Sequence, residues 1–200
     1  MSEGPVDESK RATLRRFAAL GAASPLVGLA DTGSDSHAPD AIAGYLSQTP
    51  GAHFSKVRDD LQLGTGETQH HLRALLTEGA IESERDGEYR RFFPADRFDA
   101  FERTALGYLR RETPRGMIMA LLEDPSATAG ALADRLGVST PTVSTHAGRL
   151  EEAGLLEREG GYRLRNPETL LLLVVRYADS FGSEAIAFAA GADEHVRYEG

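Results

Sequence analysis

The chain carries one sequence pattern twice, with the second copy 75 positions after the first, so that Leu61 aligns with Leu136. Residues 61–81 read LQLGTGETQHHLRALLTEGAI, and residues 136–156 read LGVSTPTVSTHAGRLEEAGLL. Both copies keep a histidine and a glycine at matching places, His71 with His146 and Gly79 with Gly154. Because each copy brings the same helix, turn and strand signals, the chain is predicted to fold as two copies of one supersecondary unit.

The signals inside each copy follow one order: the end of a short helix, a tight turn, a longer helix, then glycine and a strand. In the first copy Phe54, Val57 and Leu61 form an apolar stripe at helical spacing, and Gly64 to Gly66 make the turn. Strands are expected over 80–84 and 89–93 around the tip at 85–88, which is a hairpin signal. This order is that of a winged helix-turn-helix, a fold in which the second helix of the motif enters the DNA major groove.

The predicted fold class is therefore mainly α with small β-wings (α+β), built as two winged helix-turn-helix domains plus C-terminal helices. We expect an N-terminal extension with a flexible part over 1–40, a first domain over 41–94, a linker helix over 95–112, a second domain over 113–166 and a C-terminal helical segment over 167–200. Within the extension, residues 9–20 favour a basic helix and 31–40 a flexible linker. Arg15 and Arg16, followed by a mild apolar stretch to Ala30, also resemble a twin-arginine export signal. No apolar run approaches the ~20 residues of a membrane span.

Composition limits the kinds of site and partner that this chain can have. The chain has no Cys, which excludes disulfides and thiolate metal sites. Its net charge is −9, and Lys10 and Lys56 are its only lysines. Such an acidic, lysine-poor balance is typical of a protein in concentrated salt, where phosphate contacts lose affinity. An acidic adaptor protein is the alternative explanation of the same composition.

The longer helix of each copy supplies the predicted DNA contacts. In the first copy, over 66–77, Leu72 and Leu75 point to the core, so that Gln69, His70 and Arg73 point outward. Glutamine suits adenine and arginine suits guanine. Thr65 and Thr140 are expected to cap the two helices, with an added phosphate contact possible at each helix start. The predicted DNA-binding residues are Lys56, Thr65, Glu67, Thr68, Gln69, His70, Arg73, Arg85, Arg90, Arg91, Thr140, Thr142, Ser144, Thr145, Arg149 and Arg163.

Three further sets of residues each have more than one interpretation. The wing arginines, such as Arg85 and Arg90, either reach DNA or form cross-strand ion pairs in a solvated hairpin. His71 and His146 are expected to be packed or phosphate-facing rather than a metal pair, because no carboxylate cluster surrounds them. An apolar stripe in the tail is either a dimer seam, which we favour, or a core within the chain: Leu170, Leu173, Val174, Tyr177 and Phe181.

The two motifs also resemble known regulators. The second, LGVSTPTVSTHAGRLEEAGLLER, is similar to the arsenic-repressor and multiple-antibiotic-resistance classes of winged-helix regulators. The first, TGETQHHLR followed by EGAI and RDGEYRRFFP, resembles the tandem winged-helix regulators common in halophilic archaea. The resemblance implies a cytoplasmic, homodimeric transcription regulator that binds double-stranded DNA. Metal-sensing members use Cys or clustered His/Asp ligands, which this chain lacks, so that neither a metal nor another cofactor is expected.

Three functions are compared on these grounds. The first is a sequence-specific transcription regulator whose first domain reads bases. The second is a tandem winged-helix protein–protein adaptor of the kind found in chromosome-segregation complexes, without sequence-specific DNA binding. An enzyme is not expected, because the sequence has no glycine-rich phosphate loop, nucleophile elbow or metal-ligand spacing, and no catalytic residue is assigned.

Overall fold

A computed structural model of the chain describes residues 5–21 and 37–192. The chain divides into two compact units, Met1–Phe98 and Asp99–Gly200. Most of the expected export segment and the start of the expected linker lie outside the described residues. The end of that linker, residues 37–40, is not a linker but the first turn of a helix. None of the helices in the described ranges is long and apolar enough to cross a bilayer.

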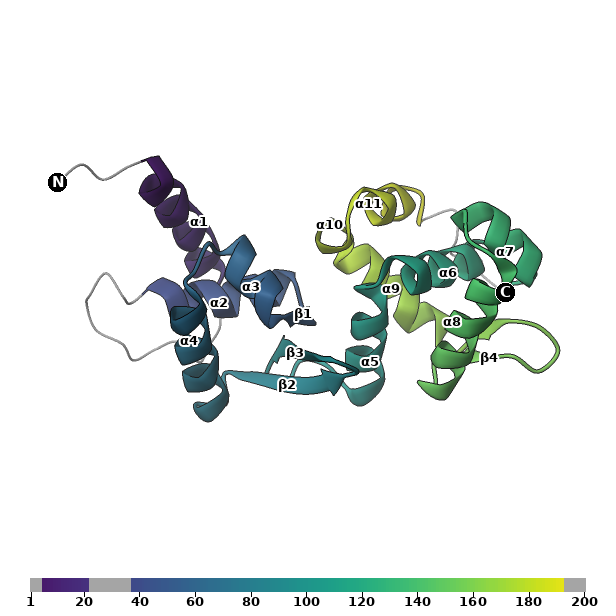
Figure 1. Cartoon of the computed structure of the whole chain (residues 1–200), viewed down its shortest axis with the longest axis horizontal. Coiled ribbons are helices and arrows are strands. Elements are labelled where there is room, and N and C mark those ends of the chain that lie inside the picture. Colours follow the sequence, from purple (N-terminus) through teal and green to yellow (C-terminus); the bar gives the residue numbers. More distant parts are fainter. Residues whose placement is uncertain (1–4, 22–36, 193–200) are drawn as a thin grey trace. The chain divides into compact units, whose positions relative to one another are not determined.

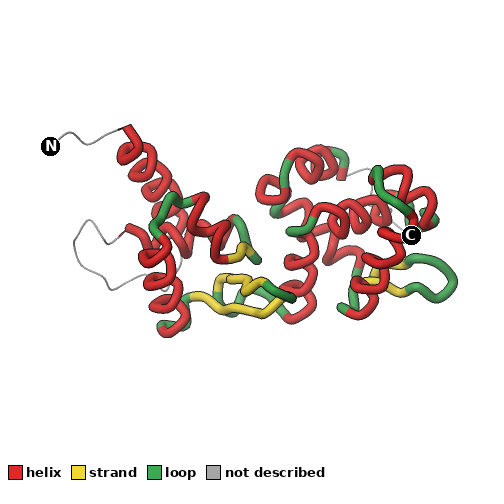
Figure 2. Tube along the Cα trace, viewed as in Figure 1, coloured by secondary structure: helices red, strands yellow, loops and turns green. Residues whose placement is uncertain are grey.

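The first unit contains four helices and a three-stranded sheet in its described part (Figures 1 and 2). In chain order these are α1 Pro5–Gly21, α2 His37–Gln48, β1 Ala52–His53, α3 Phe54–Asp60, α4 Thr65–Thr77, β2 Ile81–Asp86 and β3 Tyr89–Pro94. The sheet is antiparallel in the order β1-β3-β2. The hairpin of β2 and β3 is the wing, and both strands are longer than predicted, so that the turn is only Gly87 and Glu88.

The second unit repeats this plan and adds helices at its C-terminal end. Its elements are α5 Ala100–Leu109, α6 Glu112–Glu123, α7 Ala129–Leu136, α8 Thr140–Glu152, β4 Leu156–Glu157, β5 Arg163–Leu164, α9 Pro167–Arg176, α10 Ala178–Phe181 and α11 Ser183–Ala190. Its wing has strands of only two residues each. Where one linker helix was predicted over 95–112, the structure has α5 and then the start of α6.

The duplication seen in the sequence extends to the helix boundaries. Shifting α2 by 75 residues places it on α6 from end to end, and the same shift places α4 on α8 from end to end. The starts of α3 and α7 also coincide after this shift. The prediction of two copies of one supersecondary unit is therefore confirmed.

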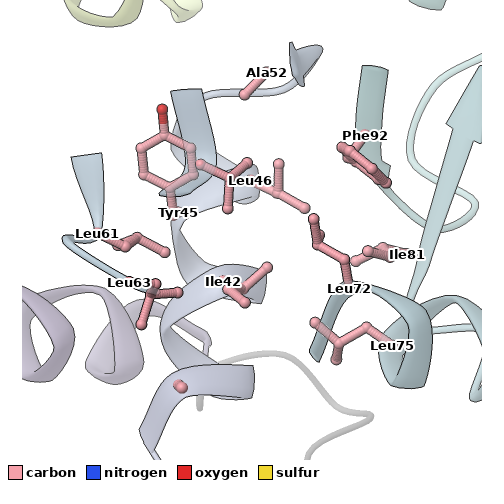
Figure 3. Packing of buried hydrophobic residues seen from close by; sticks show 12 residues of the cluster. Ile42, Tyr45, Leu46, Ala52, Leu61, Leu63, Leu72, Leu75, Ile81 and Phe92 are labelled. Atoms are coloured by element: carbon pink, nitrogen blue, oxygen red, sulfur yellow. The ribbon is translucent and has the colours of Figure 1, made fainter. Parts of the chain in front are cut away.

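The core of the first unit joins α2, α3, α4 and the sheet. Ile42, Tyr45 and Leu46 of α2 meet Leu72 of α4 and Phe92 of β3, all of them buried (Figure 3). Burial of apolar side chains on this scale is the main source of stability of a small domain.

Helix α1 is part of this first unit rather than a separate extension. Leu14 and Phe17 pack against the core, and the Phe17 ring meets the Tyr45 ring edge-on at 5.3 Å between centroids. Such aromatic pairs add about 0.5–1.5 kcal/mol beyond the area that they bury. The helix is longer than the predicted 9–20, and its inward stripe explains why it docks on α2.

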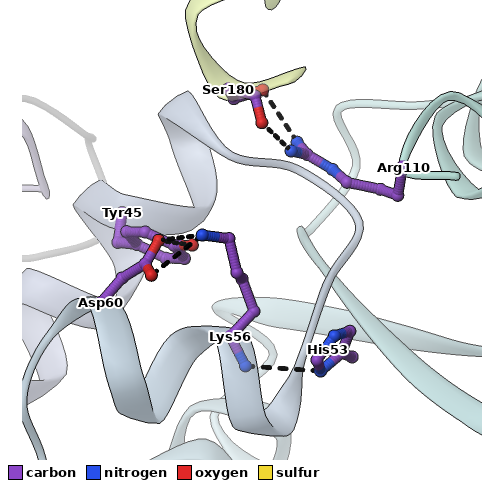
Figure 4. Close-up of polar contacts among 6 residues, drawn as sticks. All are labelled: Tyr45, His53, Lys56, Asp60, Arg110 and Ser180. Carbon is purple, nitrogen blue, oxygen red and sulfur yellow. Dashed lines mark hydrogen bonds and ion pairs between the residues drawn. The ribbon is translucent and has the colours of Figure 1, made fainter. Parts of the chain in front are cut away.

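The C-terminal helices complete the core of the second unit. Arg110, the C-cap of α5, donates from Nη1 to the Ser180 carbonyl at 2.7 Å and from Nη2 to the Ser180 Oγ at 3.0 Å (Figure 4). Its guanidinium also lies 4.6 Å from the centre of the Phe181 ring. These contacts fix α10 to α5, and α9 packs against both α5 and α6.

The expected dimer seam is wrong in its residues. All five of its side chains are already buried within the chain, so they form an intrachain core and cannot also contact a second copy. These side chains are Leu170, Leu173, Val174, Tyr177 and Phe181. The large apolar side chains exposed on the C-terminal helices are instead Leu172, Val175 and Ile186.

Candidate nucleic-acid interface

Helix α4 presents a polar face to solvent, as its periodicity predicts. Leu72 and Leu75 are buried, whereas Gln69, His70 and Arg73 are exposed. The predicted facing of this helix is confirmed. An exposed row of amide, imidazole and guanidinium groups on the second helix of a helix-turn-helix has the chemistry that reads base edges in the major groove.

The start of α4 differs from the prediction by one residue. Gly64 has the extended backbone of an N-cap, with φ −68° and ψ 152°, so Thr65 is the first helical residue and not the cap. The Glu67 side chain accepts a hydrogen bond from the Gly64 N–H at 3.1 Å. Thr68 is fully buried and its Oγ1 donates to the Gly64 carbonyl at 2.9 Å, so the assignment of Thr68 to DNA contact is wrong.

The start of α8 shows the same shift of one residue. Ser139 is the N-cap, and its Oγ accepts from the Thr142 N–H at 3.3 Å, while Thr140 is the first helical residue. The Thr142 hydroxyl is engaged with the Ser139 Oγ at 2.8 Å. In both copies the residue before the expected threonine is the last with extended backbone, which is what defines a cap.

The outward face of α8 has fewer long polar side chains than the outward face of α4. Val143, Ala147 and Leu150 are buried, as predicted. Thr145 and Arg149 are exposed, whereas Ser144 is only half-exposed, as is Thr142. Short hydroxyl side chains discriminate less well between bases than Gln or Arg does.

The first wing separates its arginines into two roles. Arg85 and Arg90 are exposed. Arg91 is 3% exposed, donates from Nη1 to the Gly51 carbonyl at 2.9 Å, and forms an ion pair with Asp86. The assignment of Arg91 to DNA contact is therefore wrong: β3 is the central strand and is buried on both faces from Arg91 to Phe93, and the Arg91 side chain joins the wing to the loop before β1.

Some basic side chains of the first unit form an ion pair with a carboxylate, and others do not. Lys56 is held by Asp60 at 2.9 Å, and that same carboxylate accepts from the Tyr45 hydroxyl at 2.8 Å (Figure 4). In the described ranges, Arg73 of α4 and Arg85 of the wing have no such ion pair. On a chain of net charge −9, these two guanidinium groups are among those ready to meet an anion.

The second wing shows the opposite pattern. Arg163 and Arg165 both pair with Glu157, at 3.2 Å and 3.3 Å. Exposed pairs of this kind contribute little to stability, but they cancel positive charge where the wing would meet phosphate. The hairpin with ion pairs is therefore the better interpretation of the second wing.

Arg149 of α8 has no ion pair among the residues that the structure describes.

His71 and His146 occupy matching places in the two copies and were expected to be packed or phosphate-facing. No cluster of three or more His, Cys, Asp or Glu side chains suited to a metal exists in the described part of the chain. His146 is half-buried with its Nδ1 enclosed and without a hydrogen-bond partner there. Burial, and then the positive charges of Arg149 and Arg111, lower the pKa of His146 below its ordinary value. Of the two expected environments, packed or phosphate-facing, the half-buried His146 is closer to the packed one.

Two contacts to the recognition helices were missed by sequence reasoning. Lys10 of α1 lies 3.2 Å from the Glu67 Oε2 of α4. In the second unit the Tyr108 hydroxyl of α5 donates to the Arg149 carbonyl of α8 at 3.0 Å. These partners are 57 and 41 residues apart, and no local pattern in the sequence connects them.

Comparison with known proteins places a family on each of the two domains. A family model described as an N-terminal HTH domain matches residues 36–106, and a model of the MarR family matches residues 115–161. An uncharacterized HTH-type transcriptional regulator of Methanocaldococcus jannaschii is 29% identical over 124 residues. That alignment covers 62% of this chain and 31% of the relative, so the chain spans about a third of the relative's length. No solved structure gives a significant match.

The fold and the comparisons agree on the architecture. Both family matches contain a helix-turn-helix and fall on the duplicated helices, and each helix pair is followed by a hairpin. The chain is a tandem winged helix-turn-helix protein with an α+β fold, as predicted.

Proposed function

We propose that this tandem winged helix-turn-helix protein is a sequence-specific regulator of transcription whose first domain reads double-stranded DNA. The observation that carries the proposal is the outward face of α4, where Gln69, His70 and Arg73 stand exposed beside a core-facing leucine stripe. The printed name of the archaeal relative, an HTH-type transcriptional regulator, supports the same function.

The chemistry of this face suits base reading in high salt. Arg73 can donate two hydrogen bonds to guanine, and Gln69 can pair with adenine, each worth about 1–3 kcal/mol of discrimination. Such contacts depend less on released counterions than phosphate contacts do. An acidic protein therefore gains most of its selectivity from α4 and less from a basic surface.

The first wing adds contacts outside the major groove. Arg85 and Arg90 are exposed on the hairpin, and wing arginines enter the minor groove or grip phosphates. The second domain has a supporting part, through Thr145 and Arg149, because the arginines of its own wing are held by Glu157. The regulator would act as a cytoplasmic homodimer on paired half-sites.

Selection of bound duplexes from a random DNA library in molar potassium chloride tests this function. The expected result is one enriched motif, with half-sites about one helical turn or a multiple of it apart. Arg73→Ala and Gln69→Ala should weaken binding and relax the preference at one base pair each. Thr77→Ala, in the last turn of α4, is the matched control and should bind as the wild type does. Unchanged preference in both α4 variants would refute the reading role of this helix.

The ion-paired second wing and the net charge of −9 favour a second candidate, a protein–protein adaptor. In that case the library would give no enriched sequence, and binding would appear only at low salt. A stable protein partner copurifying at the native salt would then identify the adaptor role.

A further inference from the structure

The first turn of α4 carries a negative charge at the place where a recognition helix approaches DNA. Glu67 is the third residue of this helix, and its Oε2 accepts from the Gly64 N–H at 3.1 Å. A carboxylate is favourable at a helix start, because it interacts with the unpaired N–H groups there. The same charge repels the phosphates that lie beside the major groove.

Lys10 of α1 cancels this charge. Its Nζ lies 3.2 Å from the same Oε2 atom that the Gly64 N–H reaches. The pair is about one-third exposed on each side, at 30% and 35% of the two side chains. Burial raises the pKa of Glu67, but the hydrogen bonds from Gly64 and Lys10 outweigh it, and the pKa lies below its ordinary value. Lys10 is thus the cation in direct contact with the Glu67 carboxylate, and His71 adds a weaker lowering of its pKa through its charge.

The second copy of the motif has neither the carboxylate at this position nor a lysine near it in the sequence. Thr142 of α8 occupies the position that Glu67 has in α4, and the cap there is the neutral hydroxyl of Ser139. The helix that precedes the second motif, α5, contacts α8 through the Tyr108 hydroxyl and a backbone carbonyl. In the described residues, the charged helix start thus occurs in the copy to which a lysine is supplied.

We propose that Lys10 is a positioning residue for DNA reading, which acts through Glu67 by removing its charge and holding its side chain against the start of α4. Helix α1 is then a working part of the first domain's DNA-binding surface. This inference rests on the proposed function of α4. It assigns Lys10 no phosphate contact of its own.

A double-mutant cycle tests the proposal in the full-length chain. The affinity for the enriched duplex is measured for the wild type, Lys10→Met, Glu67→Gln and the double variant. Lys10→Met should weaken binding about five- to tenfold, because it leaves an uncompensated carboxylate facing the duplex. In the Glu67→Gln background the same change should alter affinity less than about twofold. Lys10→Arg should restore binding, and Arg58→Met, which removes the ion pair with Asp59 on α3, is the matched control.

Two additional readouts separate this role from a purely structural one. Without DNA, nuclear magnetic resonance titration should show that Lys10→Met raises the pKa of Glu67. Circular dichroism should show that all variants stay folded, so that a change in affinity is not a change in folded fraction. Equal losses in both backgrounds, with a smaller salt dependence, would mean that Lys10 contacts phosphate directly and would overturn the proposal.

Failure of this inference is distinct from failure of the proposed function. Sequence-specific binding by the wild type that Lys10→Met leaves unchanged would overturn the role of Lys10 alone. A wild-type chain that selects no sequence would overturn both.

Discussion

The Tyr108 hydroxyl donates a hydrogen bond to the backbone carbonyl of Arg149 at 3.0 Å, and this contact ties α5 to the recognition helix of the second unit. In the first unit Lys10 ties α1 to α4. Each recognition helix is thus held by a helix that lies before the helix-turn-helix in the chain. The contacts differ in kind, since one is neutral and the other is an ion pair.

Two neighbouring arginines of β3 should differ in their contribution to stability. Arg91→Met removes a buried guanidinium from Asp86 and from the Gly51 carbonyl, and should cost about 2–4 kcal/mol of unfolding free energy. Arg90→Met changes an exposed side chain and should cost less than about 1 kcal/mol. Urea unfolding of the two variants checks this difference. Similar stability losses would contradict the inward assignment of Arg91.

The two wings should contribute unequally to DNA affinity. Arg85→Ala removes a cation that has no carboxylate partner among the described residues, and should weaken binding about three- to tenfold. Arg163→Ala removes a cation already paired with Glu157 and should have less than about a twofold effect. Fluorescence anisotropy with one labelled duplex measures both. A larger loss for Arg163→Ala would give the second wing the leading part.

His146 should make stability depend on pH. The pKa of His146 is lowered in the folded chain, so the unfolded chain binds more protons as the pH falls below about 6.5. The neutral form of His146 therefore contributes its full stability above about pH 6.5. This contribution is lost as the pH falls from there through the lower pKa that His146 has in the folded chain. Unfolding of the wild type and His146→Gln at about pH 8 and pH 5 tests the sign. Between these two pH values the wild type should lose more stability than the variant does. An equal loss would show that His146 is not a source of the pH dependence.

Two adjacent leucines of α9 should distinguish core from surface. Leu173 is 3% exposed, and Leu173→Ala should cost about 2–5 kcal/mol by leaving a cavity. Leu172 is 58% exposed, and Leu172→Gln should change stability by less than about 0.5 kcal/mol. Thermal unfolding measures both effects. Sedimentation of Leu172→Gln also shows whether this face joins two copies, because a shift toward monomer would identify it as the contact.

The fold was predictable because its strongest signals are local. The leucines of α4 repeat at helical spacing, and the glycines that end α4 and α8, Gly79 and Gly154, have φ values of 71° and 73° that favour glycine. The exact caps were missed by one residue, because Gly64 and Ser139 cap as well as threonine does and the choice depends on backbone angles.

The errors in the site have a common physical cause. Arg91 and Thr68 are polar residues that the pattern placed at the surface, yet each is buried and donates to a backbone carbonyl. The partner of Arg91 is Gly51, 40 positions away, and the partner of Thr68 is Gly64, one helical turn earlier. The apolar stripe of α9 gave no indication of whether its cover came from the same chain. Sequence periodicity identifies which side chains need burial, but a contact such as Arg91 with Gly51 arises only when folding brings together two residues that are 40 positions apart.

The anchoring of Arg91 to Gly51 has a mechanical consequence for recognition. A hairpin joined to the body of its domain by a buried guanidinium has to break that contact before it can swing to follow a groove of varying width. The contact therefore restrains the distance between the wing and the recognition helix α4. In the proposed complex the adjustment would come from the double helix, so that sequences which bend easily would be bound at lower elastic cost than stiff ones.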